Sequence, residues 1–243
     1  MSTFRFQQFS VLQQQSAMKV CTDAVLFGAM APVKNGDRVL DIGTGTGVLS
    51  LIAAQLGADK VTAVELTEQA YQEAGINFRQ SPWADRLEAV HQDIQGFAGI
   101  TKQQYDLVIS NPPFFENHFK TTAALRKTAR HNDQLPFSDL ITITSQLVSP
   151  QGLLYLLLPV HAVKKIVGGA SSAGFYLTRR IDFRAYGHYS AAKVSALTFS
   201  RTAADIVSEI LTVYESSGVY TQECERYLSA LLLRFAKDDQ MQQ

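Results

Sequence analysis

The sequence predicts an α/β protein with a mostly parallel, doubly wound sheet and helices on both of its faces. From Asp37 onward, short apolar runs typical of buried parallel strands alternate with segments that suit helices. Repeated β-α units of this kind form parallel sheets with right-handed crossovers. Two later strand-like segments, 177–186 and 194–200, have little room between them, which indicates an antiparallel hairpin at the sheet edge.

Seven strands are expected in this sheet, and the third, at 87–91, has the weakest pattern. Their ranges are 38–43, 60–65, 87–91, 105–110, 152–159, 177–186 and 194–200. Helices are expected at 23–30, 47–56, from Thr67 to about Ser81-Pro82, and at 138–147. Thr22 and Thr67 are the predicted N-caps, Gly57 closes the second helix, and Pro32 ends the first. The amphipathic stretch 227–235 is expected to pack on the sheet.

Length and composition predict one soluble globular domain over residues 1–243. We divide it into an N-terminal segment with a helix, a cofactor-binding and catalytic core, and the C-terminal half of the sheet with a closing helix. These parts span 1–36, 37–160 and 161–243. Lys plus Arg and Asp plus Glu are equal at 22 each, so nucleic-acid binding would require a local basic patch.

A cytoplasmic protein is expected. The two cysteines, Cys21 and Cys224, are far apart and form no disulfide framework, which fits a reducing compartment. The chain has no signal-like h-region and no run of about 18 apolar residues, so no membrane segment is expected. No His/Cys/carboxylate spacing indicates a metal site, and no pattern indicates an obligate protein partner.

Polar side chains follow four successive predicted strands. Asp41 lies at the end of the first, Glu65 ends the second, Asp93 follows the third and Asn111 follows the fourth. Ligands of doubly wound sheets bind at the carboxyl ends of strands, near the switch point in strand order. The four side chains are therefore expected to converge on one crevice.

The glycine loop after the first strand distinguishes between cofactor classes. Gly43, Gly45 and Gly47 form G-x-G-x-G, whereas the dinucleotide fingerprint G-x-G-x-x-G would need glycine at Val48. The Lys-Ser/Thr ending of a P-loop is also missing. Such a triplet alone is often only a tight turn. Its position between Asp41 and Glu65 favours a ligand site.

The residues around this loop match a nucleoside joined to an amino acid without phosphates, which is S-adenosylmethionine. Asp41 can accept a hydrogen bond from a ligand amine, and Glu65 can accept two from ribose hydroxyls. Asp93 is placed to accept from an adenine amino group, with Ile94 against the ring.

The segment Asn111-Pro112-Pro113-Phe114 follows the fourth strand, and its two prolines force a rigid extended turn. Asn111 Oδ1 and the Pro112 carbonyl can each accept one hydrogen of a flat exocyclic amine, while Phe114 offers a stacking face. An isolated Asn-Pro-Pro could simply end a strand. The polar residues upstream favour a catalytic clamp.

Taken in order, D-I-G-T-G-T-G, Glu65, Asp93-Ile94 and N-P-P-F resemble the motifs of class I S-adenosylmethionine-dependent methyltransferases, in the branch that methylates amino groups. The segments 4–9, 18–24 and 81–84 resemble the bacterial tRNA1(Val) adenine(37)-N6-methyltransferase family, and the resemblance covers nearly the whole chain. The family often has Tyr where this chain has Phe114, which keeps the stacking face and lacks the hydroxyl.

The resemblance implies a Rossmann-like class I methyltransferase fold and methyl transfer to the N6 amino group of an adenine in tRNA, beside the anticodon. It makes Asn111, Pro112, Pro113 and Phe114 the catalytic residues. It also implies that the first helix borders the cofactor pocket. The expected cofactor-binding residues are Lys19, Thr22, Asp41, Gly43, Thr44, Gly45, Gly47, Glu65, Leu66, Asp93, Ile94 and Asn111.

The expected contacts with the substrate come from aromatic and basic residues. Phe115 could stack a base taken out of a loop, or pack in the core. The segment 116–134 is either a basic flap that contacts phosphates or a solvated loop; its candidate contacts are Lys120, Arg126, Lys127 and Arg130. A second basic set on the predicted hairpin could extend the patch or form an ordinary sheet face; it comprises Arg179, Arg180, Arg184 and Lys193.

Two other functions remain open from the sequence. N-P-P-F/Y also serves enzymes that act on guanine N2 of rRNA, adenine N6 of DNA or protein glutamine. A non-catalytic nucleoside- or RNA-binding protein on the same fold is the other alternative, because fold alone does not determine function.

Overall fold

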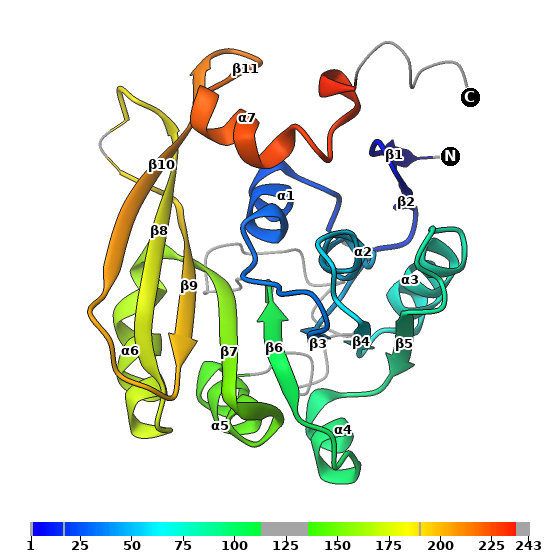
Figure 1. Cartoon of the computed structure of the whole chain (residues 1–243), viewed down its shortest axis with the longest axis vertical. Helices are drawn as coiled ribbons and strands as arrows, with labels where there is room; N and C mark the ends of the chain where they lie inside the picture. The colour runs from blue at the N-terminus through cyan, green and yellow to red at the C-terminus, as the bar shows by residue number, and fades with distance from the viewer. Residues whose placement is uncertain (1, 17, 113–135, 190, 237–243) are drawn as a thin grey trace, which may run out of the picture.

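The computed structural model describes residues 2–16, 18–112, 136–189 and 191–236, and it has a central sheet between two layers of helices (Figure 1). The strands are β1 (Thr3–Arg5), β2 (Ser10–Leu12), β3 (Arg38–Ile42), β4 (Lys60–Glu65), β5 (Leu87–His91), β6 (Tyr105–Ser110), β7 (Val148–Pro159), β8 (Tyr176–Tyr186), β9 (Val194–Ser200), β10 (Val207–Ser216) and β11 (Val219–Tyr220). The α-helices are α1 (Thr22–Ala29), α2 (Val48–Gln55), α3 (Glu68–Arg79), α4 (Ile94–Ile100), α5 (Phe137–Leu147), α6 (Val163–Ser172) and α7 (Gln222–Leu228). Two short 3-10 helices are η2 (Val160–Ala162) and η3 (Leu233–Phe235).

The main sheet has the doubly wound order that the β-α repeats predict. Its strands follow one another as β11-β10-β8-β9-β7-β6-β3-β4-β5. The five strands from β7 to β5 are mutually parallel. The chain runs outward from β3 to β5 and then returns to β6 on the other side of β3. The switch point therefore lies between β3 and β6, where a ligand crevice is expected.

All seven predicted strands are present, but the sheet extends further than the sequence analysis predicted. Nine strands in the described chain belong to it, because β10 pairs in parallel with β8 and β11 pairs with β10. The hairpin of β8 and β9 is therefore not at the edge, and that prediction is wrong. Leu211 and Val213 of β10 are buried in the core, and this apolar-polar alternation is the signal for the missed strand.

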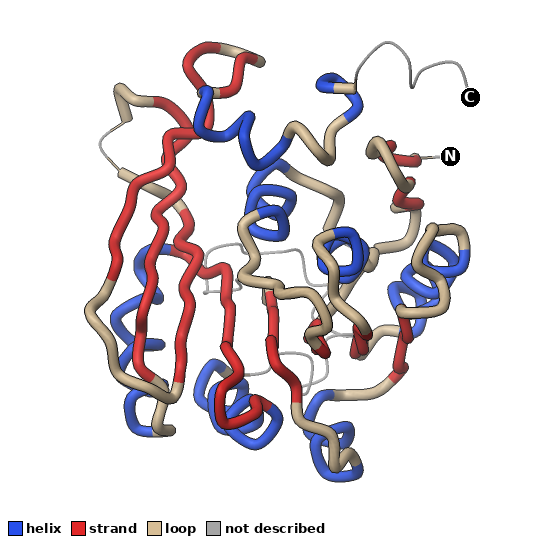
Figure 2. Tube along the Cα trace, viewed as in Figure 1, coloured by secondary structure: helices blue, strands red, loops and turns tan. Residues whose placement is uncertain are grey.

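Each face of the sheet has its own apolar core, and Figure 2 shows helices on both sides of the strands. One core joins the sheet to α1, α2, α3 and α7, with the Phe27 and Tyr155 rings stacked at 4.2 Å between centroids. The other core joins the sheet to α4, α5 and α6. The C-terminal stretch 227–235 packs on the first core through Leu228, Leu231 and Leu232, although α7 ends at Leu228.

The N-terminal segment lies beside the C-terminal segment (Figure 1). Strands β1 and β2 form a small separate sheet, and Phe6 forms an isolated bridge with Leu232. The Gln7 amide group donates to the carbonyls of Ser229 and Leu232. These contacts hold the first residues of the chain against the helical layer that contains α1 to α3.

The four helices predicted with boundaries correspond to α1, α2, α3 and α5, whereas α4 and α6 were not predicted, and the capping chemistry differs. Thr22 is the first residue of α1, not its N-cap, and its Oγ1 lies 3.0 Å from the Tyr214 hydroxyl. Thr67 occupies the N-cap position of α3, yet its hydroxyl donates to Glu65 Oε1 instead of accepting from the helix. Gly57, at φ +112°, follows α2 as predicted. Thr22 thus binds a tertiary partner, and Thr67 binds a neighbouring carboxylate, in place of capping a helix.

Gly47 is constrained both by its backbone and by its neighbours. We expect Gly47→Ala to lower the free energy of unfolding by about 3 kcal/mol, since φ is +83° and an added Cβ would lie 2.5 Å from the Phe78 ring. Gly36→Ala is the control: its φ is +89° and an added Cβ meets nothing within 4 Å, so about 1 kcal/mol is expected. Urea unfolding of both variants measures the difference, and equal losses would contradict the steric explanation.

Candidate active site

A cavity of about 360 Å³ lies at the carboxyl ends of β3, β4 and β6. This volume is within the usual range for small-molecule sites. Of the residues predicted from the sequence, the cavity is lined by Lys19, Gly43, Thr44, Gly45, Glu65, Leu66, Asp93, Ile94, Asn111 and Pro112. Asp41, Thr22 and Gly47 do not line it. The predicted convergence of strand-end residues is therefore largely present.

The glycine loop turns sharply and is tied to Glu65. Gly43, Gly45 and Gly47 all have positive φ, at 71°, 57° and 83°, which explains three glycines at alternate positions. Glu65 Oε2 accepts from the Gly45 amide at 3.0 Å, while its Oε1 accepts from the amide and hydroxyl of Thr67. The Gly45 N–H that a phosphate would need is thus already bound to a carboxylate, so the loop does not suit a pyrophosphate.

Asp41 lies behind the glycine loop and is fully buried. Its Oδ2 accepts from Thr44 Oγ1 at 2.6 Å and from Ser50 Oγ at 2.7 Å. Its Oδ1 is also buried and has no hydrogen-bond partner within the described part of the chain. Burial raises the pKa of Asp41 to about 6, although the two hydroxyl donors oppose this rise. Asp41 thus ties Thr44 of the loop to Ser50 of α2 through hydrogen bonds, and its contact with a ligand amine stays a prediction.

Asp93 and Ile94 lie at the far wall of the cavity, where β5 leads into α4. Asp93 is the N-cap of α4, and its Oδ1 accepts from the Gly96 amide at 2.7 Å. Asp93 is exposed and lines the cavity, while Ile94 beside it is buried. The cap holds the carboxylate in a defined orientation. Its proposed contact with an adenine amino group is untested.

Asn111 carries the most informative polar atom of the cavity wall. Ser110 Oγ donates to the Ile42 carbonyl at 2.8 Å, which ties the end of β6 to the end of β3 and places Asn111 beside the glycine loop. Asn111 Oδ1 is buried without a hydrogen-bond partner among the described residues. A buried acceptor without a donor costs about 1–3 kcal/mol. At the wall of a cavity, such an atom is an acceptor positioned for a ligand N–H.

The N-terminal segment forms another part of the cavity wall. Ser16, Met18, Lys19 and Val20 line the cavity, followed by Ala24 of α1. We call residues 12–16 and 18–20 the N-terminal strap. The ammonium group of Lys19 donates to the carbonyls of Gln13, Gln14 and Ser16, so its charge faces the strap and its stem faces the cavity.

Two buried polar residues of α3, which the sequence analysis missed, hold this strap. Glu73 is 3% exposed and accepts from the amides of Gln14, Gln15 and Ser16 and from the Ser16 hydroxyl. Asn77 exchanges two bonds with the backbone of Leu12 and donates to the Thr46 carbonyl. Polar residues four apart on an otherwise apolar helix face were the available signal.

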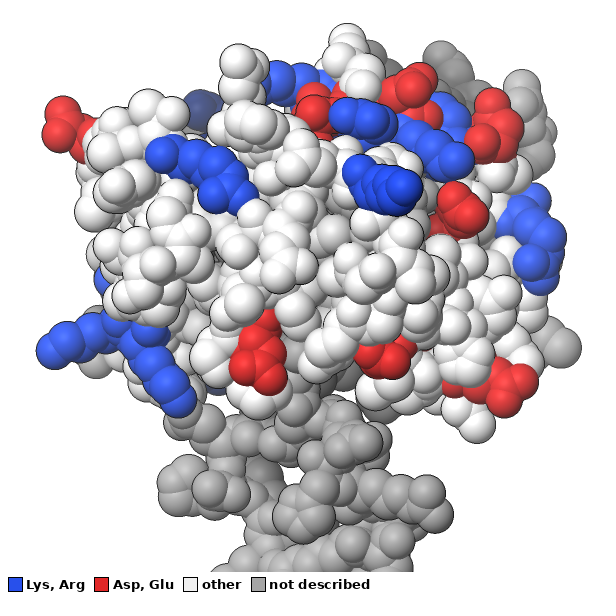
Figure 3. Space-filling model, turned by 90° about the horizontal axis from the view of Figure 1, so that it is seen from below, with Lys and Arg blue, Asp and Glu red and all other residues white. Residues whose placement is uncertain are grey.

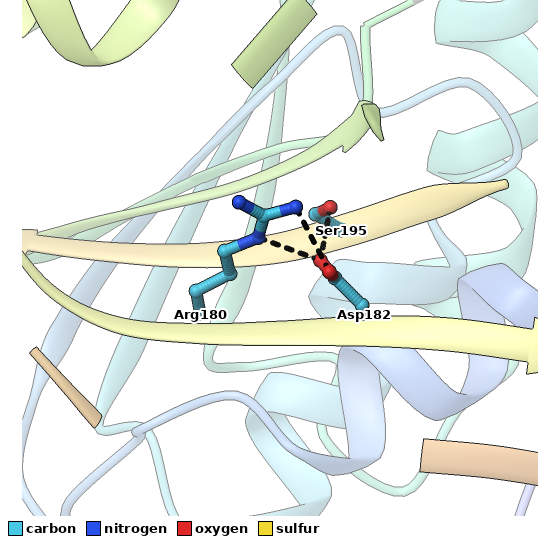
Figure 4. A network of polar contacts seen from close by, with 3 residues as sticks. All are labelled: Arg180, Asp182 and Ser195. Carbon is cyan, nitrogen blue, oxygen red and sulfur yellow. Dashed lines mark hydrogen bonds and ion pairs between the residues drawn. The ribbon is translucent and has the colours of Figure 1, made fainter. Parts of the chain in front are cut away.

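The predicted substrate residues are only partly described. Pro113, Phe114, Phe115, Lys120, Arg126, Lys127 and Arg130 lie outside the described residues. In the second basic set, Arg179 pairs with Glu209 at 3.0 Å. Arg180 binds both oxygens of Asp182, which also accepts from Ser195 (Figure 4). These two arginines are therefore neutralised within the sheet and contribute little free positive charge.

Other features of the described residues differ from this cavity. Seen from below, Lys and Arg side chains are mixed with Asp and Glu (Figure 3). A hollow of about 500 Å³ beside α3 and β5 contains none of the strand-end residues. No group of three or more His, Cys, Asp or Glu that could hold a metal occurs in the ranges that the structure describes. None of the helices described here is long and apolar enough to cross a membrane.

Comparisons with known proteins agree with this geometry. A sequence model described as "Methyltransferase small domain" matches residues 16–135. A protein of Dyadobacter fermentans named tRNA1(Val) (adenine(37)-N6)-methyltransferase is 36% identical over 96% of this chain and 98% of its own length. A Flavobacterium psychrophilum protein of the same name is 38% identical over 90% of this chain and 94% of its own length. The chain belongs to the tRNA1(Val) (adenine(37)-N6)-methyltransferase family.

Solved structures support the fold of this family member at lower sequence identity. A predicted O-methyltransferase of Agrobacterium tumefaciens has a TM-score of 0.64 at 20% identity and covers 85% of this chain and 95% of its own. A methyltransferase of Pyrococcus furiosus has a TM-score of 0.59 at 18% identity and covers 80% of this chain and 90% of its own. The Rossmann-like methyltransferase fold is thereby confirmed. The family model begins at Ser16, so its matched range includes most of the cavity wall.

Glu73 stabilises the strap through its charge. Four hydrogen bonds outweigh the effect of burial and lower the pKa of Glu73 below its ordinary value of 4.5. The contribution of the Glu73 charge to the free energy of unfolding is therefore present above pH 4.5 and is lost as the pH falls through the lowered pKa. We expect Glu73→Gln to reduce the free energy of unfolding by about 2–3 kcal/mol at pH 7, and by less in acid.

Urea unfolding of the wild type and the variant at about pH 7 and about pH 3.5 measures this difference. Glu68→Gln, which changes an exposed carboxylate on the same helix, is the matched control and should have little effect. A difference that stays constant with pH would contradict the role of the Glu73 charge.

Asp41 has the opposite pH dependence. Because the folded-state pKa of about 6 lies above the ordinary 3.8, the native state binds a proton more readily, and stability falls as pH rises through this window. Relative to Asp41→Asn, the free energy of unfolding of the wild type should fall by on the order of 2 kcal/mol between about pH 4 and pH 7. Denaturant unfolding at both pH values tests this, with exposed Asp59→Asn as the control.

Proposed function

We propose that this chain transfers a methyl group from S-adenosylmethionine to the N6 amino group of an adenine in tRNA, the adenine beside the anticodon of tRNA1(Val). The unpartnered acceptor of Asn111 at the cavity wall carries this proposal. The names of the relatives supply the substrate, and a tRNA substrate fits the cytoplasm.

The chemistry of the cavity wall suits a cationic nucleoside. Glu65 and Asp93 contribute carboxylates, whereas the ammonium group of Lys19 is bound to the carbonyls of the strap. Among the described residues, Glu65 Oε2 accepts only from the Gly45 amide and keeps acceptor capacity for a ribose hydroxyl, whereas Oε1 already accepts from the amide and the hydroxyl of Thr67. S-adenosylmethionine supplies a methyl group on a positively charged sulfur, and its adenosine and amino acid parts need no phosphate site.

Asn111 and Pro112 act on the amine that receives the methyl group. The nitrogen of an adenine amino group is a weak nucleophile, because its lone pair is delocalised into the ring. Asn111 Oδ1 and the Pro112 carbonyl each accept one amino hydrogen, which favours a pyramidal nitrogen with a localised lone pair. Fixed acceptors of this kind lower the barrier by positioning and preorganised electrostatics, and no general base is needed before transfer.

Other molecules that could receive the methyl group are less well supported. An rRNA guanine, a DNA adenine or a protein glutamine also presents a planar amino group, but the relatives are named for tRNA adenine. A non-catalytic binding protein is also less well supported, because the relatives are named as methyltransferases. The proposal includes no metal and no obligate protein partner.

Asn111→Ala tests the catalytic role. We expect methyl transfer to fall by at least about 10²-fold, because one of the two acceptors that orient the amine is removed. Cofactor affinity should change little, since the adenosine and ribose contacts lie elsewhere in the cavity. A methyl-transfer assay on tRNA1(Val) and isothermal titration with S-adenosylmethionine give the two values. Near-normal turnover would overturn the assignment.

The nucleoside product identifies the acceptor. Mass spectrometry of digested tRNA and rRNA from cells that lack this protein should show N6-methyladenosine missing from tRNA. Loss of N2-methylguanosine from rRNA instead would replace the proposed substrate with a guanine.

A further inference from the structure

The carboxyl edge of the sheet divides into two halves. The polar residues around the cavity follow β6, β3, β4 and β5, which form one half of the strand order. The other half, with β7, β8 and β10, ends in a different set of side chains. Tyr186 ends β8, and Tyr214 lies opposite it near the end of β10.

Five rings form a continuous group at this end, which we call the aromatic rim: Tyr186, His188, Tyr189, Tyr214 and Tyr220. Tyr186 is at its centre, with ring centroids 5.4 Å from His188, 5.4 Å from Tyr189 and 5.6 Å from Tyr214. Tyr214 in turn stacks on Tyr220 at 5.1 Å. These spacings are typical of favourable aromatic pairs.

The aromatic rim adjoins the wall of the cavity. The Tyr214 hydroxyl lies 3.0 Å from Thr22 Oγ1, and Thr22 stands between Val20 and Ala24, which both line the cavity. Lys193, just before β9, accepts from the Val160 amide through its carbonyl and interacts electrostatically with Asp23 of α1. The rim therefore begins beside the first turn of α1 and extends away from the cofactor half.

The rim is accessible and carries cations. Tyr189 is 44% exposed and His188 is exposed, while the other three rings are half-buried. Arg184 shares a face of β8 with Tyr186, and the Arg234 guanidinium lies 5.1 Å from the Tyr220 ring centroid. The acids nearby are Asp23, which faces Lys193, and exposed Glu215. Because the charge is mixed, ring faces are the main feature of this surface.

We propose that the aromatic rim binds unpaired nucleotides of the RNA, stacking their bases on Tyr189 and the neighbouring rings. This inference rests on the proposed function. Turning one adenine into the cavity costs the loop a few kcal/mol of stacking. Aromatic side chains next to the cavity wall replace that stacking for adjacent bases, as they do in proteins that bind single-stranded RNA.

Tyr189→Leu, Tyr189→Phe and Tyr176→Leu test the proposal. Tyr176 is the matched control: it is also 44% exposed, but it begins β8, at the end of that strand opposite Tyr186 and the aromatic rim. Fluorescence anisotropy with labelled tRNA1(Val), and with a hairpin of its anticodon stem and loop, measures binding. We expect Tyr189→Leu to weaken binding about tenfold, and Tyr189→Phe and Tyr176→Leu to stay within about twofold of wild type.

The kinetic readouts separate nucleotide stacking from a structural role. With Tyr189→Leu, the KM for tRNA should rise while kcat at saturating tRNA and the affinity for S-adenosylmethionine stay unchanged. Equal RNA binding by Tyr189→Leu and wild type, or an equal loss with Tyr176→Leu, would overturn the proposal. If the wild type binds the hairpin in a ring-dependent way but methylates no adenine, the proposed function fails and the rim proposal stands.

Discussion

The pairing of β3 with β6 is the constraint on which the rest of the site depends. It sets Ile42 opposite Ser110, and the Ser110 hydroxyl closes the junction by donating to the Ile42 carbonyl. The first residue after each strand then enters the same crevice, Gly43 from one side and Asn111 from the other. A shift in this register by one residue would send the side chains of β6 to the opposite face and separate the amide from the loop.

Around this junction, buried carboxylates organise the backbone. Asp41 binds two hydroxyls behind the glycine loop, Glu65 binds Gly45 and Thr67 in front of it, and Glu73 binds the strap. Each lies in an environment of low dielectric, where a satisfied polar group is strongly oriented and an unsatisfied one is costly. At this junction Asp41 Oδ1 and Asn111 Oδ1 are buried without a hydrogen-bond partner among the described residues, and these two acceptors are therefore informative.

Much of the fold and of the site could be predicted because the signals were local. Apolar runs located the seven predicted strands, and the glycine loop, Glu65, Asp93 and Asn111 stand at their ends. The errors concern residues whose partners are distant in sequence. Thr22 binds Tyr214 and is not the N-cap of α1, and β10 pairs with β8, so the predicted hairpin is not at the sheet edge.

By itself, the sequence determined which chemical groups terminate the strands, because turn residues and strand periodicity act over a few positions. It also determined the family, through motifs whose order and spacing are linear properties. Only the tertiary structure decided that Asp41 stands behind the loop, that Glu73 and Asn77 hold the cavity wall, and that tyrosines of β8 and β10 meet beside α1. These placements depend on pairing between segments up to about two hundred residues apart, and the hydrophobic and hydrogen-bonding gains that select them appear only when the sheet is assembled.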